Sequence, residues 1–144
     1  MSESVKQRGD KAVAYFLTGY NCAQAVFMSF AEDMGMSVED AAKLASPFGG
    51  GIGGMRETCG ALTGSFMALG SLGGFSDTGK DGVKPALYEK VKALAAKFAE
   101  EETSTVCREI LVARANGAAP HTPESPCTYC VRIAAQNLEM LING

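Results

Sequence analysis

Apolar residues recur three, four or seven positions apart along most of this chain of 144 residues. That spacing keeps them on one face of an α-helix, which turns about once every 3.6 residues. No segment alternates between apolar and polar residues for long enough to predict a β-strand. The sequence therefore predicts an all-α fold, a single-domain bundle of six to seven helices that spans residues 1–144 and has no internal repeat.

Capping residues and glycines mark the expected helix ends. Asn21 and Gln24 form a capping-box pattern, and Ser125 followed by Pro126 is typical of a helix start. The expected helices are one ending near Gly19, Asn21 to Met34, Ser37 to Ala45, Thr58 to Leu72, Lys84 to Glu101, Thr103 or Ser104 to Asn116, and a last one from Ser125 with an apolar stripe to Leu141.

The stretch Gly49 to Gly54 has the spacing of a dinucleotide-binding fingerprint. That fingerprint works between a strand and a helix, whereas the segment before it is helical and rich in alanine. We interpret the stretch as a flexible turn or a helix segment whose missing side chains let another backbone approach. Gly60 and Gly64, spaced four apart, are expected to let a neighbouring helix lie close in the same way.

Four of the five cysteines lie in or near the first turn of an expected helix, on its apolar face: Cys22, Cys59, Cys107 and Cys127. Free N–H groups at a helix start favour negative charge, and therefore the thiolate, which is the form of cysteine that binds metals. The segments between successive cysteines are long enough to bring the chain back to the end of the bundle at which the previous cysteine lies. All four helix starts can therefore collect at one end of the bundle.

Four thiolates at one point repel one another unless a cation joins them or pairs of them become disulfides. Iron–sulfur clusters and structural zinc ions both accept four cysteine ligands. Helix N-termini also stabilise the negative charge of an iron–sulfur–thiolate assembly. We therefore predict Cys22, Cys59, Cys107 and Cys127 as metal- and cofactor-binding residues, for an iron–sulfur cluster of unspecified type or, alternatively, for zinc.

These residues resemble the redox-active family named for its C_GCAxxG_C_C cysteine pattern, over nearly the whole chain. Cys59-Gly60-Ala61-Leu62-Thr63-Gly64 matches the central CGAxxG element of that family. The segments that resemble its other cysteine motifs are Tyr20–Val26, Cys107–Leu111 and Cys127–Ala135. The resemblance implies a small redox-active protein that transfers electrons through a prosthetic group such as an iron–sulfur cluster.

The same family is similar to the helical cluster-binding domain of split-Soret cytochrome c, a dimeric protein with c-type haems. This similarity implies a homodimer. The haem does not carry over, because Val131 follows Cys130 where haem attachment needs a histidine. Cys130 is also a departure from the four-cysteine pattern, which leaves open whether it is a ligand, a resolving thiol or a bystander.

Two other functions stay open. Cys127 and Cys130 have the spacing of a thiol–disulfide redox pair, and their place after Pro126 at a helix start would depress a thiol pKa. The βαβ pattern that accompanies such pairs in thioredoxins is absent. A zinc-binding helical module is the second alternative. His121, in a loop close to Cys127, is a candidate fifth ligand.

The net charge of −3 and the lack of a basic block exclude nucleic acid as an expected partner. No apolar run reaches the roughly 20 residues that span a bilayer, and the N-terminus lacks the pattern of a signal peptide. We expect a cytoplasmic protein with an unidentified redox partner protein.

No arrangement of Ser, His and Asp, or of paired carboxylates, that would indicate a hydrolase is visible, and whether the chain is an enzyme is left undecided. The charged residues beside the cysteines, Arg56, Glu57 and Arg108, are candidates for tuning the charge of a cluster, but we expect them at solvated surface positions.

Overall fold

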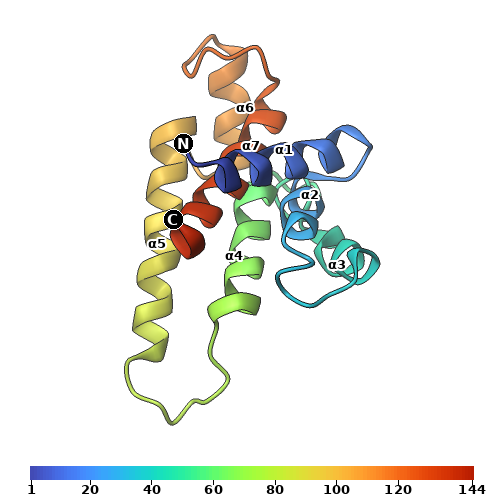
Figure 1. Cartoon of the computed structure of the whole chain (residues 1–144). Helices are drawn as coiled ribbons and strands as arrows, with labels where there is room; N and C mark the ends of the chain where they lie inside the picture. The colour runs from blue at the N-terminus through green and yellow to red at the C-terminus, as the bar shows by residue number, and fades with distance from the viewer.

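Seven α-helices and one short 3-10 helix build the protein, and its only β-bridge joins Thr58 to Val106. The computed structural model describes residues 1–144 (Figure 1). The predicted all-α class is confirmed. The elements are α1 (Glu3–Leu17), α2 (Cys22–Ser29), α3 (Val38–Ala45), η1 (Ser46–Phe48), α4 (Gly60–Gly73), α5 (Val83–Glu102), α6 (Cys107–Ala115) and α7 (Pro126–Asn143).

Helix α7 is the centre of the bundle and packs against α1, α2, α4, α5 and α6. Its apolar stripe is buried as far as Leu138, whereas Leu141 is 40% exposed near the end of the helix. Because neighbours enclose it on several sides, α7 also buries polar residues, which need partners away from water. The Asn137 amide donates to Glu101 at 2.7 Å, and Glu139 accepts from Arg8 at 2.7 Å.

Helices α2 and α4 touch backbone to backbone at two glycines. A Cβ atom on Gly64 would lie 2.7 Å from the carbonyl oxygen of Ala23, and one on Gly60 would lie 3.3 Å from the Ala23 nitrogen and 2.8 Å from the carbonyl oxygen of Phe48. The expected close approach at Gly60 and Gly64 is therefore confirmed. The contact sets the first turn of α4 beside the first turn of α2.

Helix α2 ends at Ser29, earlier than the expected Met34. The Arg8 guanidinium donates to the carbonyl oxygen of Ser29 and lies over the Phe30 ring, 4.1 Å from its centroid. The next helical hydrogen bond, from the Phe30 amide to the Val26 carbonyl, is not made, because the Phe30 amide donates to the Phe27 carbonyl at 3.1 Å and the Ser29 hydroxyl donates to the Val26 carbonyl at 2.6 Å. Residues 30–35 therefore continue as turns and not as α-helix.

Helices α4 and α6 begin at a shared piece of extended backbone. The Cys59 amide donates to the Thr105 carbonyl at 2.8 Å, and the Cys107 amide donates to the Glu57 carbonyl at 2.6 Å. The pairing keeps residues 105 and 106 extended, so Val106 is the N-cap of α6 in place of the expected Thr103 or Ser104. Cys59, and not Thr58, is the N-cap of α4.

Helices α4 and α5 extend away from the bundle and are joined by the loop of residues 74–82 (Figure 1). Leu94 and Phe98 of α5 are buried as expected, but Leu87 and Val91 are only half-buried because they lie nearer the free end. None of the helices combines the length and the hydropathy that crossing a bilayer requires.

Replacing Gly64 by Ala should lower the free energy of unfolding by about 1–3 kcal/mol, because the added methyl group meets the backbone of α2. Gly70 is the matched control: it lies in the same helix, and a Cβ there meets nothing within 4 Å. Gly70→Ala should stabilise by up to about 1 kcal/mol through helix propensity. Urea denaturation measures both. Equal effects of the two substitutions would contradict the close contact.

Candidate functional site

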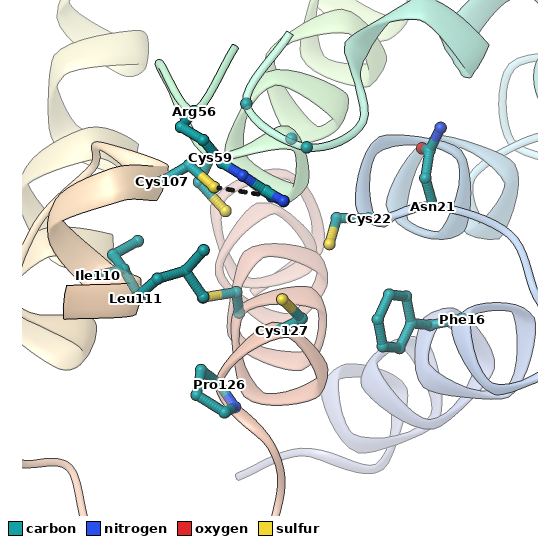
Figure 2. A pocket seen from close by; sticks show the side chains of 14 residues that line it. Phe16, Asn21, Cys22, Arg56, Cys59, Cys107, Ile110, Leu111, Pro126 and Cys127 are labelled. Atoms are coloured by element: carbon teal, nitrogen blue, oxygen red, sulfur yellow. Dashed lines mark hydrogen bonds between the residues drawn. The ribbon is translucent and has the colours of Figure 1, made fainter. Parts of the chain in front are cut away.

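All five cysteines line one cavity of about 170 Å³, where the N-termini of four helices meet (Figure 2). Cys22 and Cys107 are the first residues of α2 and α6, Cys59 is the N-cap of α4, and Cys127 is the second residue of α7. The structure therefore brings together the four cysteines predicted as ligands. Their binding of a cofactor stays a prediction.

Local capping fixes two of these helix starts as the sequence predicts. The Asn21 side chain accepts from the Gln24 amide at 2.9 Å, and the Gln24 side chain accepts from the Asn21 amide at 3.0 Å, which completes the capping box. Ser125 caps α7 by accepting from the Thr128 amide at 3.3 Å, and Pro126 is the first helical residue. These caps hold Cys22 and Cys127 at the cavity wall.

The cavity has a buried side and an open side. Cys59, Cys107 and Cys130 are buried, whereas Cys22 and Cys127 are half-buried and within reach of solvent. Apolar side chains complete the wall: Phe16, Ile110 and Leu111. Apolar surroundings strengthen electrostatic interactions between the groups inside.

The thiols affect one another's pKa mainly in two pairs, Cys22 with Cys127 and Cys59 with Cys130. Hydrogen bonding from the Cys22 thiol is the main cause that lowers the pKa of Cys127 to about 6, against the opposing effect of burial. The same contact raises the pKa of Cys22. In the second pair, hydrogen bonding from Cys130, helped by amides in the first turn of α4, lowers the pKa of Cys59, while the pKa of Cys130 is raised.

Cys130 has an additional partner, which the sequence did not reveal. Its thiol donates to Oε2 of Glu102 at 3.4 Å, and Nη1 of Arg114 donates to Oε1 of Glu102 at 2.7 Å. Glu102 is completely buried, and this burial raises its pKa against the opposing effect of Arg114. Glu102 ends a run of three glutamates, and nothing in that run distinguishes it from its solvated neighbours.

Arg56 is exposed, as expected, and it also lines the cavity. Its Nη1 donates to Sγ of Cys107 at 3.8 Å, the contact drawn as a dashed line in Figure 2. Glu57 and Arg108 do lie at the surface, where they form an exposed ion pair at 3.5 Å. The sequence offers all three residues as candidates for tuning charge, and the conformation of the preceding loop is what places Arg56, and not the other two, at the cavity.

His121 lies in a separate surface hollow with Arg114 and Glu124, so the structure does not bring the candidate fifth ligand to the cysteines. No three His, Cys, Asp or Glu side chains lie close enough together to hold a single metal ion. The five thiols instead surround a cavity. This donor set, soft thiols around a space bounded by apolar side chains, fits a group larger than one ion.

Comparison with known proteins identifies one relationship. A family model described as "Putative redox-active protein (C_GCAxxG_C_C)" matches residues 20–141, a range that contains all five cysteines. No curated protein and no solved structure matches the chain. The resemblance drawn from the cysteine motifs is thereby confirmed.

Metal-free, reduced protein should react with iodoacetamide at Cys127 with a pH midpoint of about 6. The thiolate is the nucleophile, so the rate should rise as the pH rises through this value and then level off. Peptide mass spectrometry measures the rate at each cysteine. Cys22→Ala removes the hydrogen-bond donor and should shift the midpoint upward. A midpoint of about 8.5 in the wild type, the value of an ordinary cysteine, would contradict this arrangement.

Proposed function

Because the chain belongs to the C_GCAxxG_C_C family, we propose that it is a redox protein that transfers electrons through an iron–sulfur cluster bound by Cys22, Cys59, Cys107 and Cys127. One observation carries the proposal: these four thiols line a single cavity, each from the start of a different helix. Such a cluster supplies a centre that accepts and releases electrons.

The charges around the cavity support a cluster bound by thiolates. The positive ends of four helix dipoles meet at the cavity, and in the first turn of α4 hydrogen bonding from the amides of Ala61 and Leu62 lowers the pKa of Cys59. The Arg56 guanidinium adds a full positive charge beside Cys107. Thiolates bound to iron and sulfide carry net negative charge, which this surrounding stabilises.

The spacing of the thiols favours a cluster over zinc. Four thiolates around one tetrahedral zinc ion lie about 3.8 Å from each other, since each zinc–sulfur bond is about 2.3 Å long. No group of three or more candidate ligands meets the requirement for one ion. A cluster contains several irons bridged by sulfides, so its ligands surround a larger centre.

The ligand set excludes Cys130. Cys130 lies one turn inside α7, and its thiol donates to the buried Glu102 carboxylate. A thiolate at that position would place a second negative charge beside Glu102 in surroundings of low polarity, which is unfavourable. Cys127, one turn earlier, has no carboxylate hydrogen bond and faces the open side of the cavity.

Anaerobic reconstitution with iron and sulfide, followed by chemical analysis of both, tests the proposed function. The wild type should bind iron and sulfide and become coloured, and Ser substitution of Cys22, Cys59, Cys107 or Cys127 should remove most of both. Cys130→Ser is the matched control and should bind as much as the wild type.

A wild type that stays colourless and free of iron, with its thiols reduced, would contradict the cluster. Loss of iron in Cys130→Ser would contradict the assignment of the ligands. Zinc at one equivalent, in protein made without added metals, would favour the zinc-binding alternative.

A second candidate function, thiol–disulfide exchange, rests on the pairing of thiols at the cavity. Cys22 and Cys127 shift each other's pKa, as do Cys59 and Cys130, and each pair links α7 to another helix. The pairs differ from the Cys127–Cys130 pair that the sequence spacing predicts. In this reaction a dithiol gives two electrons and two protons to a disulfide such as glutathione disulfide, which leaves as two thiols.

Oxidation of the metal-free protein by glutathione disulfide tests this candidate. Peptide mapping under non-reducing conditions should find bonds between Cys22 and Cys127 and between Cys59 and Cys130, with Cys107 free. A bond between Cys127 and Cys130 would favour the pair predicted from spacing, and five reduced thiols would contradict exchange at this site.

The remaining features of the proposal are a cytoplasmic location, where reducing conditions keep cysteines as thiols, and a redox partner protein that exchanges electrons with the cluster. The homodimer implied by the similarity to split-Soret cytochrome c belongs to the same set of predictions.

A further inference from the structure

Residues 49–57 form a tight loop that closes on itself at the wall of the cysteine cavity. The Arg56 amide donates to the Gly50 carbonyl at 3.0 Å, and the Glu57 amide donates to the Gly51 carbonyl at 2.9 Å. Gly51 has φ +72°, and a Cβ there would lie 2.6 Å from the Glu57 nitrogen, so only glycine fits. The glycine-rich stretch is therefore a hydrogen-bonded turn in which the backbone of residues 56 and 57 approaches Gly51 closely, as expected for missing side chains.

Arg56 ends this loop in a conformation that is rare for a residue with a side chain, with φ +61°. Backbone hydrogen bonds from the first two residues of α6 also hold this end of the loop in place. The Arg108 amide donates to the Arg56 carbonyl at 3.1 Å, and the Cys107 amide donates to the Glu57 carbonyl at 2.6 Å. Such a conformation persists where its surroundings fix it, and this often happens at functional sites.

The charge of Arg56 is the only arginine charge in the protein without a carboxylate partner. Arg8, Arg108, Arg114 and Arg132 each form at least one ion pair with Asp or Glu. Arg56 forms none, is the only basic residue that lines the cavity, and instead donates to Sγ of Cys107 at 3.8 Å. Its positive charge also acts on Cys127, at the open side.

We propose that the glycine-rich loop serves to hold Arg56 at the cysteine cavity, where its guanidinium stabilises negative charge on the sulfur groups and raises the reduction potential of the centre they bind. The part on the reduction potential rests on the proposed function, whereas the part on charge at the thiols stands without it. Arg56 is a positioning residue in this account: it contacts a thiol and does not react.

Arg56 is expected to raise the reduction potential because reduction adds negative charge to the centre. One electron makes the centre more negative, and a nearby cation stabilises the reduced form more than the oxidised form. A guanidinium stays charged at every pH at which the protein is folded. Arg56 is also exposed, so dissolved salt should weaken its effect.

The first readout is the midpoint potential of the reconstituted protein. Arg56→Asn removes the charge with a residue type that tolerates positive φ, so the loop conformation is kept. Its potential should shift to a more negative value, by an amount that shrinks as the salt concentration rises. Arg56→Lys should lie near the wild type. Arg108→Gln is the matched control: it removes an equal charge next to Cys107 in sequence but outside the cavity, and should leave the potential nearly unchanged.

The second readout uses metal-free protein and compares two alkylating reagents at one pH, the anionic iodoacetate and the neutral iodoacetamide. The same thiolate meets both, so the ratio of the two rates reports the local charge and not the fraction of thiolate. At low salt the iodoacetate-to-iodoacetamide ratio at Cys127 should fall about two- to fivefold in Arg56→Asn, and should stay at the wild-type value in Arg108→Gln.

An unchanged ratio in folded Arg56→Asn would overturn the role at the thiols, and an unchanged potential with full iron content would overturn the role in tuning. A wild type that binds no iron would contradict the proposed function, and the ratio of alkylation rates would then still decide whether Arg56 acts on the thiols. Circular dichroism confirms that each variant is folded.

Discussion

The structure depends on the meeting of four helix N-termini at one cavity. Backbone contacts achieve this meeting in two places. Gly60 and Gly64 let α4 lie against Ala23 at the start of α2, and the pairing of residues 57–59 with 105–107 joins the starts of α4 and α6. The central helix α7 begins at the same cavity, directly after its N-cap Ser125. Each cysteine thus takes its position from main-chain geometry, which tolerates little displacement.

This arrangement makes the electrostatic environment of the thiols differ between the two sides of the cavity. The dipoles of the four helices and the charge of Arg56, which has no carboxylate partner, favour negative charge on the sulfurs at the cavity. On the inner side, the buried Glu102 disfavours it at Cys130. The two sides thus distinguish Cys130, which donates a hydrogen bond to a carboxylate, from the four cysteines at the helix starts. Burial among apolar residues strengthens both effects.

The sequence predicted the features that depend on local signals. The helical class, the capping box at Asn21 and the Ser125–Pro126 start follow from spacing and caps, and the structure has them. The lengths of the connecting segments permit the four cysteines to converge without requiring it, and the structure brings them to one cavity. The missed features depend on partners far away in the chain. The Thr58–Val106 bridge moves the start of α6 to Cys107, and the loop of residues 49–57 brings Arg56 to the sulfur of Cys107. Glu102 was also missed, because its burial comes from α6 and α7 and not from its neighbours in sequence.

The central claim is that these thiols jointly bind a cluster of iron and sulfide. X-ray absorption at the iron edge, on protein purified without oxygen, tests it most directly because it reports the atoms around each iron. The account predicts sulfur as the nearest neighbour of iron, together with scattering from a second iron. Iron surrounded by oxygen or nitrogen, with no neighbouring iron, would contradict it.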